Sequence, residues 1–208
     1  MEKTHILPIN SPLAIPTALE VLNRDGLVAF PTDTVYGLAS RLDSKTAIEN
    51  LFTAKGRDFN KAIAVLIGDL DQVYLVSASF PASAALLAAR FWPGALTLVV
   101  TRQPFLPVNL SPNETIGMRM PDHPFTRQLL RVAGPLATTS ANLSGLSNPL
   151  SVQDVLTQMD GRIDLILDGG TVSGGVPSTV VGCISAELVF FRHGAISEEK
   201  IRETLNGS

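Results

Sequence analysis

The sequence predicts a single α/β domain with a mixed β-sheet over residues 1–208. Three observations lead to this fold class. Strand-like and helix-like segments alternate along the chain, which is typical of α/β proteins. The length of 208 residues is enough for one domain with a substantial core. Several strand candidates cluster late in the chain, which favours a mixed sheet over a purely parallel one.

The expected helices are marked by apolar periodicity and by capping residues. One follows Ser11 and stops near Gly26, and a second begins at the N-cap candidate Ser44. Others start near Pro81 and cover residues 125–132, 152–159 and 198–205, with Ser151 and Asp154 forming a capping box. The expected strands are residues 27–30, 62–67, 96–100, 115–120, 136–139, 163–167, 178–184 and 188–191.

Composition excludes several classes of protein. Apolar runs such as residues 62–67 are far too short to cross a bilayer, and no signal-peptide pattern begins the chain. A single cysteine, Cys183, rules out an internal disulfide, so we expect a buried thiol and a cytoplasmic location without membrane attachment. The net charge of −3 argues against nucleic-acid binding as the main activity, although it leaves transient contact with tRNA open.

Familiar catalytic motifs are missing from the sequence. There is no GxxxxGK[ST] phosphate loop, no GxGxxG after a strand and no GxSxG elbow. The histidines His5, His123 and His193 are isolated, so no metal-ligand set can be named. The chemistry must therefore be sought elsewhere.

Polar residues gather instead at six junctions, most of them beside strands. Ligands of α/β sheets bind at such strand ends, but hydroxyl and amide side chains also cap turns and loops. Lys55 and Arg57 could converge on a polyphosphate, or could simply complement a helix C-terminus. Arg119 within a half-buried strand needs a partner, which a carboxylate ligand or a buried acidic side chain would equally provide. The junctions are residues 30–38, 55–57, 117–121, 137–145, 174–181 and 191–194.

Taken in order, these segments resemble the YrdC-like threonylcarbamoyl-AMP synthase family. The resemblance runs from about Ala14 to Ile201, and its most specific part is the Lys-x-Arg pair followed by Ser-x-Asn. We expect the short, single-domain form of the family. The matching segments are GLVAFPTDTVYGL at 26–38, KGR at 55–57, WPGALT at 92–97, GMRMP at 117–121, SANLSG at 140–145, PSTVV at 177–181 and RHG at 192–194.

The resemblance implies an open, twisted sheet around a central ligand cavity and a nucleotidyltransferase activity. Threonine, bicarbonate and ATP, with Mg²⁺ on the triphosphate, would give threonylcarbamoyl-AMP and pyrophosphate. Partner proteins would then transfer the threonylcarbamoyl group to tRNA. No protein ligand for the metal can be named.

The same resemblance assigns the site residues. Lys55 and Arg57 would be catalytic, and both should lie on solvent-facing cavity walls. The implied ATP-binding residues are Lys55, Arg57, Thr97, Ser140, Asn142 and Arg192. The implied residues for threonine and its carbamate are Thr32 or Thr34, with Arg119, Thr138 and Ser178.

Two other functions remain open at this stage. An RNA-binding module of the same fold would need a basic groove and would bind with a steep salt dependence. A carbamoyl-adenylate-forming domain, of the kind found in hydrogenase-maturation proteins, would normally be accompanied by further domains. The net charge and the single tryptophan argue against the RNA-binding module, and a purely structural role would leave the six polar junctions unexplained.

Overall fold

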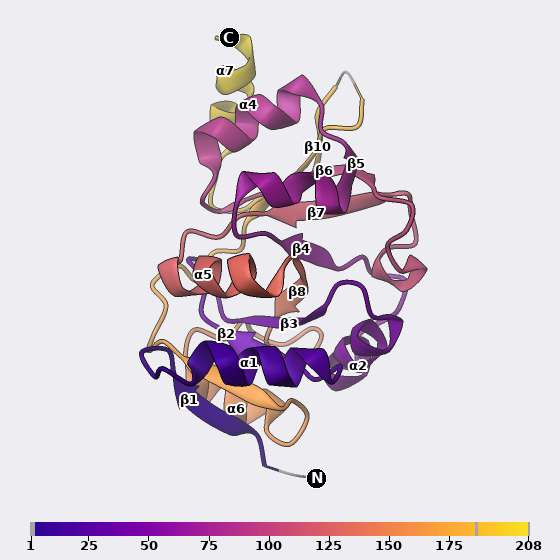
Figure 1. Ribbon diagram of the computed structural model, residues 1–208. Helices are drawn as coiled ribbons and strands as arrows, with labels where there is room; N and C mark the ends of the chain where they lie inside the picture. Colours follow the sequence, from indigo (N-terminus) through magenta and orange to yellow (C-terminus); the bar gives the residue numbers. More distant parts are fainter. Residues whose placement is uncertain (1–2, 186, 208) are drawn as a thin grey trace.

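The computed structural model describes residues 3–185 and 187–207, and one mixed sheet runs through it (Figure 1). The spatial order of the strands is β1-β9-β2-β3-β8-β4-β7-β6-β10-β11, with β5 paired to β6. Both parallel and antiparallel pairs occur, so the prediction of a mixed sheet is confirmed. The strands are β1 (His5–Pro8), β2 (Val28–Phe30), β3 (Gly37–Arg41), β4 (Ala64–Leu66), β5 (Ser77–Ser79), β6 (Leu96–Arg102), β7 (Thr115–Arg119), β8 (Leu136–Ser140), β9 (Leu165–Asp168), β10 (Thr179–Gly182) and β11 (Val189–Arg192).

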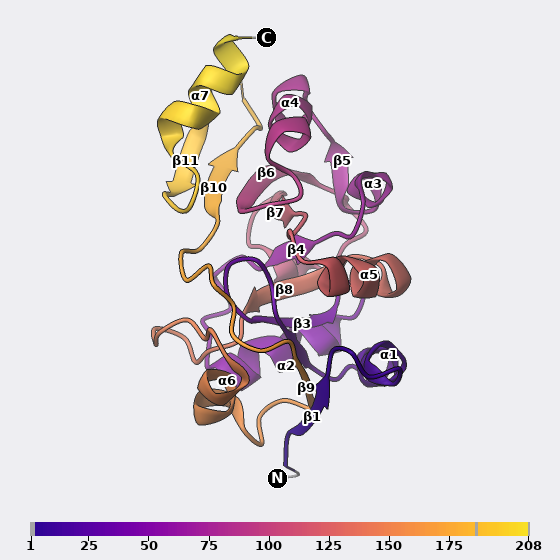
Figure 2. The same cartoon turned by 90° about the vertical axis from the view of Figure 1, so that its left-hand side faces the viewer.

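Helices flank the sheet on both sides. Figure 2 shows α1 and α5 on one side of the sheet and α6 on the other. Within the described residues, no helix is both long enough and apolar enough to cross a membrane. The helices are α1 (Ala14–Asn23), α2 (Lys45–Lys55), α3 (Val73–Val76), α4 (Ala82–Phe91), α5 (Pro124–Ala133), α6 (Val152–Met159) and α7 (Glu198–Asn206), with short 3₁₀ turns at Leu70–Gln72 and Val108–Leu110.

The core consists of two apolar clusters, because the sheet has a packed surface on each side. One cluster joins α1 and α5 to strand residues such as Leu66 and Leu136. The larger cluster joins α2, α4, α6 and α7 to strand residues such as Val65, Leu98 and Met118. Side chains alternate between the two faces of a strand. The neighbours Val65 and Leu66 accordingly belong to different clusters.

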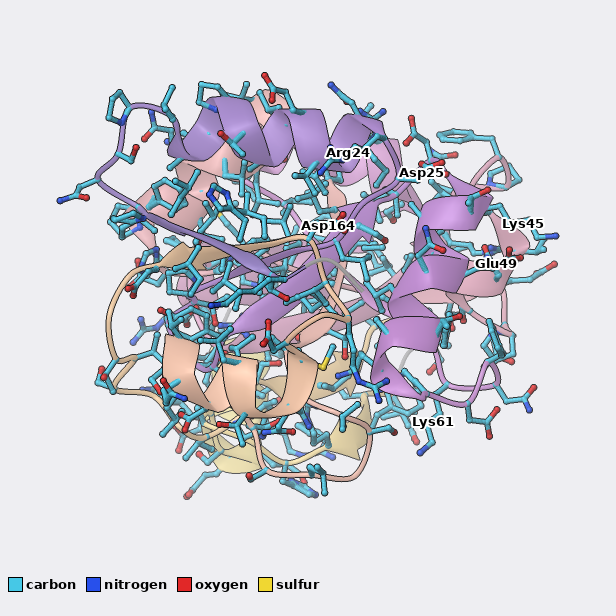
Figure 3. The ribbon with its side chains drawn as sticks, turned by 90° about the horizontal axis from the view of Figure 1, so that it is seen from below. Arg24, Asp25, Lys45, Glu49, Lys61 and Asp164 are labelled. Atoms are coloured by element: carbon cyan, nitrogen blue, oxygen red, sulfur yellow. The ribbon has the colours of Figure 1, made fainter. Side chains whose placement is uncertain are left out.

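Helix ends follow the predicted capping chemistry. The Ser44 hydroxyl accepts a hydrogen bond from the Ala47 amide at 3.2 Å, which satisfies one of the free amides of the first turn of α2. Ser151 and Asp154 form the reciprocal capping box at the start of α6, as predicted. Charged side chains near α1 and α2, among them Lys45 with Glu49, lie on the surface seen in Figure 3.

Three strands escaped prediction from the sequence. β3 pairs antiparallel with both β2 and β8, yet its residues Gly37–Arg41 are mostly small and polar and give no apolar strand signal. β1 lies at one end of the strand order, pairs with β9 and ends at Pro8, which an edge strand tolerates because its outer amides need no partner. β5 is a three-residue strand that pairs with β6.

Candidate functional site

One face of the sheet contributes side chains to a pocket of about 470 Å³. The lining crosses neighbouring strands in register: Thr138 of β8 pairs with Ala64 of β4, and Thr97 of β6 pairs with Val180 of β10. Arg119 at the end of β7 lies between these pairs in the strand order. Such a volume lies in the range of about 300–1,000 Å³ that is typical of small-molecule sites.

The floor of the pocket depends on a small residue in β7. A Cβ atom added to Gly117 would lie 3.0 Å from the Thr97 methyl and 3.7 Å from the Ala64 Cβ. A side chain there would press on a neighbouring strand and fill space that the lining now leaves open. Gly117 is therefore part of the shape of the pocket as well as of the sheet.

Most of the predicted site residues come together in this pocket. They arrive from loops and strands that are distant in the sequence, as expected for ligand sites at strand ends. Lys55 and Asn142 do not line it. The predicted residues that do are Thr32, Thr34, Arg57, Thr97, Arg119, Thr138, Ser140, Ser178 and Arg192.

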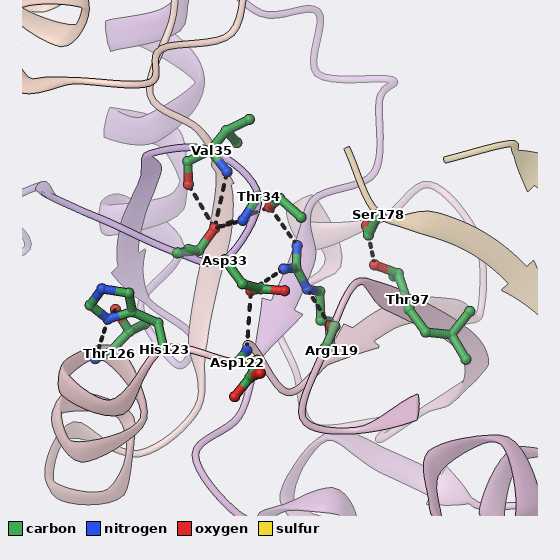
Figure 4. A network of polar contacts seen from close by, with 12 residues as sticks. Asp33, Thr34, Val35, Thr97, Arg119, Asp122, His123, Thr126 and Ser178 are labelled. Atoms are coloured by element: carbon green, nitrogen blue, oxygen red, sulfur yellow. Dashed lines mark hydrogen bonds and ion pairs between the residues drawn. The ribbon is translucent and has the colours of Figure 1, made fainter. Parts of the chain in front are cut away.

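Arg119 is buried, with 7% of its surface exposed, and three segments hold its guanidinium group. Nε donates to the Gly94 carbonyl at 2.9 Å and one terminal nitrogen donates to the Thr34 hydroxyl at 3.0 Å. The other terminal nitrogen forms an ion pair with Asp33 (Figure 4). Burial lowers the pKa of Arg119, and the Asp33 carboxylate opposes that shift. The arginine therefore stays charged in a fixed orientation.

The hydroxyl groups of Thr32 and Thr34 have different roles. Thr32 Oγ1 donates its one proton to the Val35 carbonyl at 2.6 Å and accepts from the amides of Thr34 and Val35. The proton and both acceptor lone pairs of Thr32 Oγ1 are then in use, so the Thr34 hydroxyl, 3.0 Å away, can form at most a weak, shared hydrogen bond with it. Thr32 thus closes the turn, while Thr34 keeps a proton that a ligand could redirect. This favours Thr34 over Thr32 as the ligand-contacting residue.

A second group of hydrogen-bonded side chains comes from β6, from the residue before β10 and from β11. The hydroxyls of Thr97 and Ser178 lie 2.8 Å apart, and Arg192 donates to the carbonyl of Ser178 at 2.9 Å and to its hydroxyl at 3.0 Å. Thr97 and Ser178 are buried, whereas Arg192 is exposed. These hydrogen bonds therefore connect the buried floor of the pocket to its exposed rim.

Arg57 and Arg192 carry positive charge that no described carboxylate neutralises. Neither forms an ion pair with a residue that the structure describes, and none of the described lining residues is an aspartate or glutamate. Arg57 donates to the Ala62 carbonyl at 2.9 Å, and its buried Nε has no partner within the described chain. Burial, and secondly the charge of Arg192, lowers the pKa of Arg57. This part of the pocket is suited to an anion.

The expectation that Lys55 lies on a solvent-facing wall is wrong. Lys55 is 2% exposed, and its ammonium group donates to the carbonyls of Ser140, at 2.5 Å, and of Asn142. The Lys55 carbonyl in turn accepts from the Ser144 amide at 2.9 Å. Burial, assisted by the charge of Arg57, lowers the pKa of Lys55 to about 7. Lys55 therefore holds the end of β8 and the loop that follows it from the side that does not line the pocket.

Asn142 supports the same loop. Its side-chain amide donates to the carbonyls of Leu143 at 2.9 Å and Leu146 at 2.8 Å, and its buried Oδ1 has no partner in the part of the chain described. Direct contact of Lys55 or Asn142 with ATP stays a prediction.

Some pocket residues were not singled out from the sequence. Ser111 and Asn113 follow β6, and Asn148 precedes α6, and all three line the pocket. They lie outside recognisable motifs, so only their polarity could have pointed to them. The sequence left an acidic partner for Arg119 open, and the structure identifies that partner as Asp33.

The site residues do not fit a metal ion held by the protein. Among residues 3–185 and 187–207, no group of three or more His, Cys, Asp or Glu side chains could hold a metal. Mg²⁺ prefers oxygen ligands that include carboxylates, and the polar side chains of the described lining are hydroxyl, amide and guanidinium groups.

Comparison with known proteins shows the family of this chain. The chain matches the family model Sua5_yciO_yrdC, described as "Telomere recombination", over residues 20–194. It belongs to the Sua5/YciO/YrdC family. A relative in this family named threonylcarbamoyl-AMP synthase, from Bacillus subtilis, is 40% identical over 211 residues, which cover 99% of this chain and 60% of the relative.

Other members of the Sua5/YciO/YrdC family extend the comparison. A putative threonylcarbamoyl-AMP synthase of Mycobacterium tuberculosis is 36% identical over 92% of this chain and 88% of its own length. The crystal structure of P. abyssi Sua5 complexed with L-threonine superposes with a TM-score of 0.89 and 35% identity, covering 92% of this chain and 57% of the other. The chain spans about 60% of the length of the Bacillus subtilis relative. The family and the fold expected from the sequence are confirmed.

Proposed function

We propose that this chain is an L-threonylcarbamoyladenylate synthase that condenses L-threonine, bicarbonate and ATP with release of pyrophosphate. The observation that carries the proposal is that one pocket contains Arg57 and Arg192, which have no carboxylate partner among the described residues, together with Arg119, which is held by Asp33. Such a pocket can receive a polyphosphate and a carboxylate side by side. The names of the relatives and the threonine bound to P. abyssi Sua5 support the same reaction.

Arg57 and Arg192 are the proposed partners of the triphosphate. Their charges would offset the phosphate oxygens, and Ser140 and Thr97 would add neutral hydrogen bonds. Lys55 and Asn142 would act on ATP through the loop that they brace. Nucleotidyl transfer depends on positioning and charge neutralisation, so no nucleophilic side chain is required.

The amino acid is proposed to bind at Arg119. Three of the five guanidinium N–H donors have protein partners, which leaves two for the carboxylate of threonine. Thr34, Thr138 and Ser178 would then contact the carbamate formed from threonine and bicarbonate. A carbamate oxygen would attack the α-phosphorus of ATP, and pyrophosphate would leave.

The product would serve in threonylcarbamoyl-adenosine modification of tRNA. Transferase proteins would take up the activated group, with at most transient contact between this chain and tRNA. We propose a cytoplasmic location, because ATP and the tRNA substrates are available there. We also propose that one YrdC-like domain over residues 1–208 is the catalytic unit.

The decisive experiment is pyrophosphate release by the purified protein from ATP, bicarbonate and Mg²⁺. L-threonine, L-serine and no amino acid are compared at equal concentrations. Release that depends on threonine is the expected result. ATP binding without release would contradict the proposed reaction, and absence of ATP binding with salt-sensitive RNA binding would favour the RNA-binding alternative.

A further inference from the structure

The three arginines that line the pocket differ in whether a carboxylate neutralises them. Arg119 is ion-paired with Asp33, whereas Arg57 and Arg192 have no carboxylate partner among the described residues. Arg119 and Arg192 are near enough for the charge of Arg192 to lower the pKa of Arg119. An anion entering the pocket therefore meets one neutralised and two unneutralised guanidinium groups.

Asp33 is held in a position from which it neutralises Arg119. Its Oδ1 accepts from the guanidinium of Arg119 and from the Asp122 amide, the latter at 3.1 Å (Figure 4). Its side chain is 17% exposed, and it does not line the pocket, although Arg119 and its neighbour Thr34 do. Asp33 thus reaches Arg119 from behind and ties the loop after β2 to the segment after β7.

Neutralisation changes which anion is favoured at Arg119. A guanidinium paired with a carboxylate keeps its remaining N–H donors but attracts a second charge less strongly, because the carboxylate repels it. A monoanionic carboxylate, which uses two parallel N–H donors, suffers less from this repulsion than a phosphate group with two charges. The unneutralised pair at Arg57 and Arg192 suits the phosphate group better.

We infer that Asp33 is a positioning residue that also sorts the two anionic substrates. It orients Arg119 toward the carboxylate of the amino acid and keeps phosphate groups away from that end of the pocket. This inference rests on the proposed function, since threonine supplies the carboxylate and ATP the phosphate.

The test compares Asp33→Asn with Asp122→Asn and the unmodified protein. Asparagine keeps the shape and an acceptor oxygen for the Asp122 amide, so the fold should persist, and thermal melting checks this. Asp122→Asn removes an exposed carboxylate from the same segment without touching Arg119. Calorimetry measures threonine binding without ATP, and steady-state assays measure pyrophosphate release with inorganic sulfate as a competing tetrahedral dianion.

For Asp33→Asn we expect threonine affinity to fall about tenfold, with the KM for threonine rising and kcat changing less than threefold. Sulfate should compete with threonine at least tenfold more effectively than in the unmodified protein and in Asp122→Asn. Unchanged threonine affinity and sulfate competition, in a protein that still releases pyrophosphate with threonine, would overturn the inference alone. A lower kcat with an unchanged KM for threonine and no competition by sulfate would also overturn it, because a purely structural role would have that effect. An unmodified protein without threonine-dependent release would overturn the proposed function and the inference with it.

Discussion

The ammonium group of Lys55 donates to the backbone carbonyl of Ser140, with 2.5 Å between Nζ and O, across the gap between α2 and the loop after β8. A second bond to the Asn142 carbonyl makes Lys55 the brace of that loop. Ser140 lines the pocket and Lys55 does not, so Lys55 is connected to the pocket through the backbone of Ser140.

Lys55→Met should therefore destabilise the protein as well as weaken ATP binding. Methionine fills similar space but leaves two carbonyls without their donor, which should lower the free energy of unfolding by about 1–3 kcal/mol. Urea unfolding measures this, with Lys45→Met, an exposed lysine of the same helix, as the control. Loss of ATP binding with an unchanged free energy of unfolding would instead indicate direct contact between Lys55 and phosphate.

The pH dependence of stability gives a second check on Lys55. Its pKa is about 7 in the folded protein and near its ordinary value of 10.5 when unfolded, so the unfolded state binds more protons between these values. The contribution of Lys55 to stability should thus be greatest above pH 10.5 and be lost as the pH falls toward 7.

Urea unfolding at several pH values within this window measures that contribution. The free energy of unfolding should rise with pH more steeply in the unmodified protein than in Lys55→Met. The difference in slope has an upper limit of about 1.4 kcal/mol per pH unit. Parallel curves for the two proteins would contradict the lowered pKa.

Local patterns predicted much of the fold. Apolar runs such as that of β4 and capping serines such as Ser44 depend on neighbours in the chain, and these predictions were confirmed. β3 was missed because its residues Gly37–Arg41, most of them small or polar, lack a local strand pattern. They form a strand through pairing with β2 and β8. That pairing leaves no trace in local composition.

The site was predictable in part for the same reason. Polar residues at strand ends, such as Thr138 and Ser178, were expected to converge and do so. The burial of Lys55 depends on carbonyl groups 85 or more positions away, to which no residue type gives a clue. For Arg119 the sequence left a carboxylate ligand and an acidic side chain open, and the ion pair with Asp33 still leaves guanidinium donors for a ligand.

Arg57→Met should weaken ATP binding with little effect on stability. One terminal nitrogen of the Arg57 guanidinium donates to the carbonyl of the exposed Ala62, so the change removes little from the fold. A charge-assisted hydrogen bond of about 1.5–3 kcal/mol to phosphate corresponds to a rise in the KM for ATP of roughly 10- to 100-fold. Arg24→Met is the control, because Arg24 pairs at 3.8 Å with Asp164 on the surface shown in Figure 3. An unchanged KM for ATP would exclude Arg57 from the triphosphate site.

Thr32→Val and Thr34→Val should separate stability from substrate binding. Valine at position 32 deprives the buried amides of Thr34 and Val35 of their acceptor, so the free energy of unfolding should fall by about 1–3 kcal/mol. Valine at position 34 removes the hydroxyl that faces the pocket, so the KM for threonine should rise while stability falls less.

Urea unfolding and threonine-dependent pyrophosphate release, measured on both variants, provide the comparison. Equal destabilisation with an unchanged KM for threonine in both would mean that the two hydroxyls serve only the turn. In that case Arg119, whose guanidinium donates to Thr34, would have to bind the amino acid without help from the loop after β2.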